Sequence, residues 1–354
     1  MTRRLTACAL AVLALLAMNA SARAEMDGDC VYTLLGPDGE ALTRRGGRIW
    51  EGDEYISGDD GWYRVVSVDD AAMTATAEYL GQAVADAAAF SALAEKQDDR
   101  KLVAMYSTHS DESYLPEDGT ASKWKGAGIY DVGDSLKEAL EERGIETIYS
   151  KETFLPHDAD AYTRSRRVAE ELLKKNPDAL LDIHRDAVPA EEYETEVDGE
   201  DISKVRLFVG RNNQNSAENK AFAQQIKAEA DREYPGLIKD IFIGKGNYNQ
   251  ELYPHALLLE FGTHEIEKEK AQEATGYIAE VLDNVLYGGS AKAEGGKSTS
   301  GKAVARGVGW IVGLAAVAAI VYALAATGSF KGAWEKVGRR ASEMTGGLFG
   351  KKRD

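Results

Sequence analysis

Cysteine is almost absent from this sequence, since Cys8 and Cys30 are the only two among 354 residues. So few thiols exclude a small scaffold held together by disulfides. Positive charge is also in short supply, because 42 Lys and Arg face 59 Asp and Glu, for a net charge of −17. A surface that acidic repels phosphates, so no nucleic acid partner is expected. With 44% apolar and 29% charged residues, the composition is that of an ordinary globular chain with room for about two domains.

The first 24 residues carry three arginines and no acid. Arg3 and Arg4 precede an apolar run over residues 5–18, and Ala22-Arg23-Ala24 follows that run. A basic start, a short apolar stretch and a small-x-small site are typical of a secretory signal peptide, here residues 1–24. The run is short for a membrane-spanning helix, so cleavage is favoured over a retained anchor.

A second apolar segment lies near the C-terminus. Residues 307–330 contain no charge and are long enough to cross a bilayer core of roughly 30 Å. Residues 331–354 are rich in Lys and Arg, which stay in the cytoplasm beside a spanning helix. A flexible linker at 288–306 separates the segment from any core, which argues against a buried helix. We therefore expect an exported protein that a C-terminal transmembrane helix anchors in the cytoplasmic membrane, with a short basic cytoplasmic tail.

Between these ends, the pattern of apolar residues divides the sequence into a β module, a linker and an α/β domain. Residues 25–82 predict a small β module, because short alternating runs lie between Gly and Asp turns, and no chemical site is evident there. These runs are 48–50, 54–56, 62–66 and 74–80. Residues 83–100 form an Ala-rich linker. From 101 to 287 apolar strands alternate with amphipathic helices, which predicts an α/β catalytic domain, a sheet with helices on both faces. The predicted strands are 102–106, 145–149, 179–183, 205–209 and 256–261, and the predicted helices are 131–143, 162–175, 217–233 and 265–286.

Open α/β sheets place their functional side chains at the carboxyl ends of strands. Three predicted strands end in polar residues: the first in His109 and Glu112, another in His184, and a third in Glu260. Two histidines and one glutamate, with a fourth position open for water, are the protein ligands of many hydrolytic zinc sites. The H-x-x-E spacing lets one turn deliver His109 and Glu112 to the same Zn²⁺ ion. His184 would add the third ligand from a neighbouring strand.

Glu260 is expected to act as the catalytic base. It ends an otherwise apolar strand, where burying a carboxylate costs free energy, so its presence there indicates a functional role. It can take a proton from water activated by the ion and return that proton to the leaving amine. Each feature alone is common, since most histidines at strand ends are only hydrogen-bonded. The combination at three strand ends favours a zinc hydrolase.

Four segments carry a family resemblance: Thr108–Tyr114, Leu181–Asp186, Asn247–Gln250 and Leu257–Gly262. They are similar to the motifs of the stage II sporulation protein P family, which belongs to the superfamily of zinc-dependent N-acetylmuramoyl-L-alanine amidases. The resemblance implies a phosphorylase/hydrolase-like zinc amidase fold. It also implies cleavage of the peptidoglycan amide between N-acetylmuramic acid and the L-alanine of the stem peptide. The family's motifs would make His109 and His184 zinc ligands and Glu260 the catalytic glutamate.

The remaining site residues leave alternatives open. The second zinc ligand is Glu112 or His157, because amidases of the wider superfamily place that glutamate farther from the first histidine. Arg185 can grip a carboxylate of the stem peptide through a bidentate pair or hold a neighbouring aspartate. Asn249 is a candidate for binding sugar or peptide amides.

Two other functions compete with the amidase. One is a zinc endopeptidase or carboxypeptidase that acts within stem peptides, which the H-x-x-E spacing permits. The other is an inactive wall-binding or regulatory protein that keeps the fold. The presence of His109, His184 and Glu260 argues against the inactive protein. The expected partners are peptidoglycan, the cytoplasmic membrane, and other wall-remodelling or sporulation proteins.

The expected topology can be tested by cysteine labelling of intact cells. A cysteine introduced near Arg340 should resist a membrane-impermeant thiol reagent, whereas a cysteine in the body of the protein should react. Truncation before Gly307 should release the protein in soluble form. Labelling near Arg340 together with protection of the body would contradict this orientation.

Overall fold

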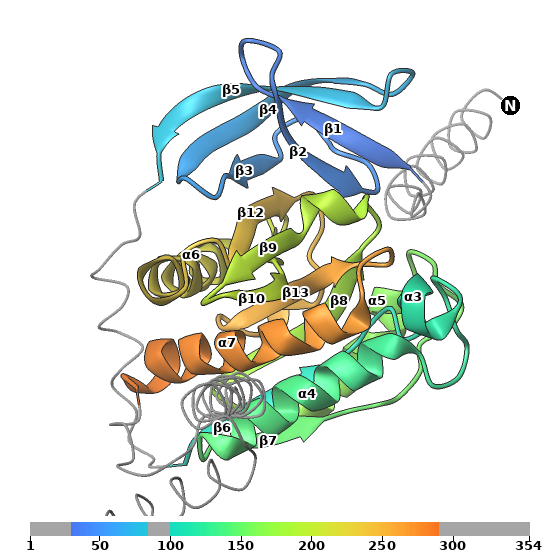
Figure 1. Cartoon of the computed structure of the whole chain (residues 1–354), viewed down its shortest axis with the longest axis vertical. Coiled ribbons are helices and arrows are strands. Elements are labelled where there is room, and N and C mark those ends of the chain that lie inside the picture. Colours follow the sequence, from blue (N-terminus) through green and yellow to red (C-terminus); the bar gives the residue numbers. More distant parts are fainter. Residues whose placement is uncertain (1–29, 84–99, 290–354) are drawn as a thin grey trace, which may run out of the picture. The chain divides into compact units, whose positions relative to one another are not determined.

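The computed structural model describes residues 30–83 and 100–289, and these residues build one large mixed sheet (Figure 1). The sheet has eleven strands in the order β2-β1-β5-β4-β3-β12-β11-β13-β8-β6-β7, and a separate hairpin pairs β9 with β10. The strands are β1 (Val31–Leu35), β2 (Ala41–Gly46), β3 (Glu54–Ile56), β4 (Gly61–Asp69), β5 (Thr74–Gln82), β6 (Leu102–Tyr106), β7 (Glu146–Tyr149), β8 (Ala179–Asp186), β9 (Glu194–Val197), β10 (Glu200–Ser203), β11 (Val205–Gly210), β12 (Ile238–Gly244) and β13 (Ala256–Thr263). The helices are α3 (Leu115–Asp118), α4 (Gly128–Glu142), α5 (Ala161–Leu173), α6 (Ser216–Glu233) and α7 (Lys268–Tyr287), with 3₁₀ turns at Ala190–Glu192 and Gln250–Leu252.

The predicted α/β region is confirmed in its main elements. The five predicted strands correspond to β6, β7, β8, β11 and β13, and the four predicted helices match α4 to α7 within a few residues at each end. β12 was not predicted, because Lys239 and Asp240 interrupt its apolar run. The strands β1, β2, β9 and β10 were not predicted either. The strand predicted at 48–50 is wrong, since that segment lies between β2 and β3. These errors fall where long-range pairing decides the structure and the local pattern is weak.

Helices cover both faces of the sheet, as predicted. On one face α4, α6 and α7 pack over the main core, to which Met105, Leu181 and Leu259 belong. On the other face α5 packs against Tyr106 and Leu180. Successive side chains of a strand point to opposite faces. This second face therefore also carries the polar residues of β8 that lie an even number of positions from Leu180.

The N-terminal strands continue the same sheet. β3 pairs antiparallel with β12, and Tyr55 is the register partner of Phe242. The module formed by β1–β5 also packs on the second face, because Leu34 and Val65 share a hydrophobic cluster with Phe208 and Phe242. The module and α5 thus approach the second face from two sides.

A buried arginine ties the module to the sheet. Arg206 on β11 is fully buried, and its guanidinium donates to Asp240 on β12 at 2.6 Å and to Asp186 on β8 at 2.7 Å. It also donates to the Thr43 hydroxyl and the Arg44 carbonyl on β2, at 2.8 Å and 2.9 Å. A buried charge needs such complete pairing because its removal from water is costly. Arg206 therefore connects β11 to the adjacent β12, to β8 on the far side of β13, and to the module with one side chain.

Several sequence predictions fall outside the described residues. They are the signal peptide at 1–24, most of the linkers at 83–100 and 288–306, the transmembrane helix at 307–330 and the basic tail at 331–354. In residues 30–83 and 100–289, no helix combines the length and the apolar character that a bilayer crossing requires.

The Arg206 network predicts a loss of stability in acid. Burial alone would raise the pKa of Asp240, but Arg206 and Lys239 lower it to about 2. A carboxylate whose pKa is lowered in the folded state stabilises the fold at neutral pH. It loses that contribution as the pH falls from about 4 to about 2. Over this range we expect the free energy of unfolding to drop by about 2 kcal/mol more in the wild type than in D240N.

Urea denaturation at a series of pH values measures this difference. D134N is a matched control, because Asp134 forms its ion pair at the surface, and this variant should follow the wild type. An equal decline in the wild type and in D240N would contradict the role given to Asp240.

Candidate metal centre and active site

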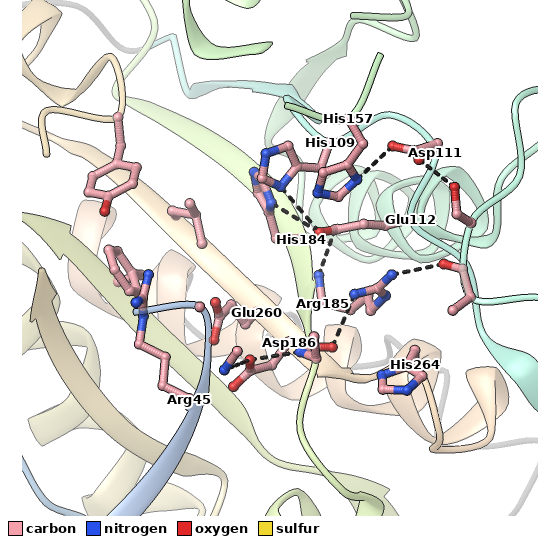
Figure 2. A pocket seen from close by; sticks show the side chains of 18 of the residues that line it. Arg45, His109, Asp111, Glu112, His157, His184, Arg185, Asp186, Glu260 and His264 are labelled. Carbon is pink, nitrogen blue, oxygen red and sulfur yellow. Dashed lines mark hydrogen bonds and ion pairs between the residues drawn. The ribbon is translucent and has the colours of Figure 1, made fainter. Parts of the chain in front are cut away.

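The candidate site is a cavity of about 410 Å³ at the carboxyl ends of β8 and β13 (Figure 2). Its walls come from the segment after β6, from the two strand ends, from α5 and from β2 of the module. Five of the six predicted site residues line it: His109, Glu112, His184, Arg185 and Glu260. The strand-end prediction thus led to the region where the structure forms a cavity.

The H-x-x-E segment forms a turn that places its two ends side by side. The backbone N–H of Glu112 donates to the carbonyl of His109 at 3.1 Å, which is the i to i+3 bond of a β-turn. Oε1 of Glu112 lies 3.4 Å from Nδ1 of His109. Asp182 on β8 anchors the turn, because its carboxylate accepts from the backbone N–H and the hydroxyl of Thr108, at 2.8 Å and 2.6 Å.

His184 reaches the same carboxylate from β8. Its Nδ1 lies 3.5 Å from Oε1 of Glu112, and its ring centroid is 4.9 Å from that of His109. Its Nε2 is buried and makes no hydrogen bond of good geometry, although an oxygen of Asp182 lies 2.9 Å away as an ion-pair partner. Both histidines predicted as ligands therefore approach the carboxylate of Glu112, the third predicted ligand.

His157 joins this group from the segment between β7 and α5. Its ring stacks on that of His109, with centroids 4.0 Å apart. The candidate ligand atoms of His109, Glu112 and His157 lie within 4.8 Å of one another. Nδ1 of His157 hydrogen-bonds Asp111 at 3.0 Å, and a carboxylate behind the ring is the usual support of a metal-binding histidine. The structure thus brings both candidates for the second ligand, Glu112 and His157, to the same place.

Burial and mutual charge set the pKa values in this group. Burial lowers the pKa of His109 to about 4. Burial acts in the same direction on His184, but the carboxylates of Asp182 and Glu112 outweigh it and raise the pKa to about 10. Burial would raise the pKa of Glu112, yet the charge of His184 and the hydrogen bond with His109 hold it well below its usual range. Zn²⁺ binds the neutral form of a histidine ring, so it would displace the extra proton of His184 on binding. The ionised Glu112 carboxylate and the imidazole rings are donor types that zinc accepts.

Glu260 lies on β13 in register with His184 on β8. Register partners on neighbouring strands point to the same face, so the Glu260 carboxylate enters the same cavity. The Tyr193 hydroxyl lies 3.0 Å from the carboxylates of Glu260 and Asp186. Burial and the charge of Asp186 raise the pKa of Glu260 to about 7, with Arg206 opposing them. A group that titrates near neutral pH can both accept and donate a proton.

The two residues predicted to bind substrate differ in their placement. Arg185 lines the cavity, but its guanidinium donates to backbone carbonyls on the segment after β6 and on β8 itself. Those hydrogen bonds hold the cavity wall together. Asn249 is buried away from the cavity, and its amide donates to the carbonyl of Tyr162 at 3.0 Å. The same amide donates to the Ser165 hydroxyl at 3.1 Å. Asn249 therefore supports Tyr162, which does line the cavity, and Ser165 behind it.

Tyr162, Tyr248 and Arg45 are among the lining residues that were not predicted from the sequence. Tyr162 and Tyr248 pack edge to face, with ring centroids 5.2 Å apart. Tyr248 lies within the Asn247–Gln250 segment, so the motif itself was the available signal. Arg45 comes from the N-terminal module, where alternating strands alone give no sign of chemistry.

Comparisons with known proteins match the region that contains these motifs. A profile of the family described as Stage II sporulation protein P matches residues 64–283. Stage II sporulation protein P of Bacillus subtilis (strain 168) is 31% identical to this chain over 208 residues, which cover 53% of the chain and 52% of that relative. The chain thus spans about half the length of the curated relative it matches.

Among solved structures, an N-acetylmuramoyl-L-alanine amidase from Clostridium difficile 630 shares 13% identity over 53% of this chain and 97% of that chain. The TM-score is 0.33, which is too low to establish a common fold. The family profile, in contrast, extends over more than half of the sequence, from β4 into α7. The chain therefore belongs to the stage II sporulation protein P family.

Proposed function

We propose that this protein is an exported, membrane-anchored zinc hydrolase of peptidoglycan. Its reaction is cleavage of the amide between N-acetylmuramic acid and the L-alanine of the stem peptide. The observation that carries the proposal is the convergence of His109, Glu112, His184 and Glu260 in one cavity at two neighbouring strand ends. Membership of the family supports it, and the membrane anchor and extracytoplasmic location rest on the charge pattern of the two chain ends.

The side chains of the site fit a zinc ion. Imidazole and carboxylate groups are ligands that zinc accepts, and the carboxylate of Asp182 stands behind His184. We assign His109, Glu112 and His184 as the ligands, with His157 as the alternative to Glu112. When bound, the ion would activate water and polarise the amide carbonyl.

The protein's own part in the reaction centres on Glu260. Its carboxylate would accept a proton from the attacking water and deliver it to the nitrogen of the departing L-alanine. The carbon–nitrogen bond breaks as the carbon–oxygen bond forms, and the products are a muramic acid carboxylate and a free amino group. Hydrogen bonding to Tyr193 would hold the Glu260 carboxylate in place for both transfers.

Mass spectrometry of digested peptidoglycan tests the reaction. Incubation with the zinc-loaded full-length protein should release stem peptides that begin with a free L-alanine. E260Q keeps the shape of the side chain but cannot take the proton, so the rate should fall by roughly 10² to 10⁴. E138Q, a change at an exposed position of α4, should leave the rate unchanged.

Other products would favour the other functions. Stem peptides cut internally or at their cross-links would indicate the endopeptidase or carboxypeptidase. An absence of any product would indicate the inactive wall-binding protein. Full activity of E260Q would show that Glu260 is only a strand-end carboxylate.

Metal analysis separates the ligands from the base. H109A, H184A and E112Q should lose nearly all bound zinc after dialysis, whereas E260Q should keep it. H157A should retain zinc with an affinity lowered about 10- to 100-fold, the usual effect of losing an outer-shell partner. If H157A loses the metal and E112Q stays loaded, His157 is the ligand in place of Glu112. Full zinc retention by both H109A and H184A would overturn the assignment.

A further inference from the structure

The cavity has a second end that the proposed chemistry does not use. Arg45, Phe208, Tyr248 and Leu258 line this part, which we call the module end. In Figure 2, Glu260 lies between Arg45 and the cluster of histidines. Phe208 is on β11 and Leu258 on β13, whereas Arg45 is on β2. The N-terminal module therefore supplies the cationic group of the module end.

Arg45 is held rigidly in this position. The carbon of its guanidinium lies 5.0 Å from the ring centroid of Phe208 and 5.2 Å from that of Phe242. The neighbouring Gly46 donates its backbone N–H to Asp186 at 3.0 Å. A Cβ atom at Gly46 would lie 2.8 Å from Cβ of Ala187, so only glycine permits this close approach of β2 to the end of β8. Rigid placement lowers the entropy that a binding residue loses when it meets its ligand.

The guanidinium of Arg45 has hydrogen-bonding capacity to spare. Its Nη1 donates to the carbonyl of Arg48, but its Nε is buried and has no hydrogen-bond partner. Among the residues that the structure describes, no carboxylate lies within ion-pair distance of Arg45, although its charge acts from farther away against the raised pKa values of Glu260 and Asp53. Burying a donor without an acceptor costs free energy. Because Nε is closed off from solvent, a ligand would meet the guanidinium through its Nη atoms, at the edge that faces the cavity.

We propose that Arg45 binds a carboxylate of the stem peptide, and this inference rests on the proposed function. A planar guanidinium recognises a carboxylate by two parallel hydrogen bonds. Phe208, Tyr248 and Leu258 are almost fully buried, but they line the cavity and make its wall apolar beside that charge, which suits the apolar part of a peptide. The module end is thus a peptide subsite.

The chemistry of the substrate sets the orientation of binding. In the cleaved amide the carboxyl group of muramic acid is consumed, so the glycan side of the bond carries no free carboxylate. The free carboxylates all belong to the peptide. Arg45 therefore directs the peptide toward the N-terminal module and the glycan toward the opposite side of the cavity, where Asp111 lies in Figure 2 and where Ser122 donates to Asp111.

Synthetic muramoyl peptides that differ in one carboxylate test this assignment. One substrate has all its peptide carboxylates free, and each of the others has one of them converted to a carboxamide. The zinc-loaded full-length protein should lose about 10- to 100-fold in kcat/KM when the recognised carboxylate is amidated. R45Q should lose the same factor with the free substrate and no longer distinguish it from that carboxamide. R45K keeps the charge without the planar fork, so it should retain part of the preference for the free carboxylate. This variant keeps the test usable if R45Q fails to fold.

R44Q is the matched control, because the side chain of Arg44 pairs with Glu191 at the surface and does not line the cavity. It should behave as the wild type with every substrate. If amidation changes nothing in the wild type, or if R45Q and R45K slow all substrates equally, Arg45 is not a carboxylate-binding residue.

A binding measurement separates this inference from the proposed reaction. If the wild type hydrolyses none of the substrates, calorimetry with the same peptides still reports the subsite. Weaker binding of one carboxamide by the wild type, with no such difference in R45Q, would support Arg45 while the amidase assignment fails. Equal binding of all the peptides, or binding of none, would overturn the subsite.

Discussion

The guanidinium of Arg206 donates hydrogen bonds to strands on both sides of β11 and to β2 of the N-terminal module. The cavity depends on this arrangement, because β8 and the module form two of its walls. Among the acceptors is Asp186, whose other oxygen accepts the N–H of Gly46. One buried ion network therefore connects the sheet to the segment that carries Arg45. Removing the guanidinium would leave the buried carboxylate of Asp186 without the cation that pairs with it.

A second layer of carboxylates orders the histidines. Asp182 holds the turn that presents His109, and it also faces the ring of His184. Asp111 does the same for His157. The spacing of Leu181–Asp186 explains part of this pattern, since alternate residues of a strand share a face. Asp182, His184 and Asp186 thus point into one region, and each of the two aspartates positions a different part of the site.

The sequence predicted the strand ends well because an apolar run that stops at polar residues is a local pattern. The strands β6, β8 and β13, which lead to His109, His184 and Glu260, were predicted from this pattern. His157, in contrast, sits in a loop, and no local pattern shows that its ring stacks on His109. Arg206 stands out as a lone charge in an apolar run, yet its partners lie on three other strands. Arg45 was missed for the same reason, since its neighbours in space are remote in sequence.

The pairing of β3 with β12 has a consequence for the order of folding. Ile56 is the register partner of Ile241, so the first strands of the protein must wait for residues near the end of the domain. Closing so long a loop costs chain entropy before any contact compensates for it, and contacts of large sequence separation slow folding. The wall that carries Arg45 is therefore completed only after β12 has been synthesised. Until then, the apolar side of the module lacks Phe242, one of the residues that it packs against in the finished protein.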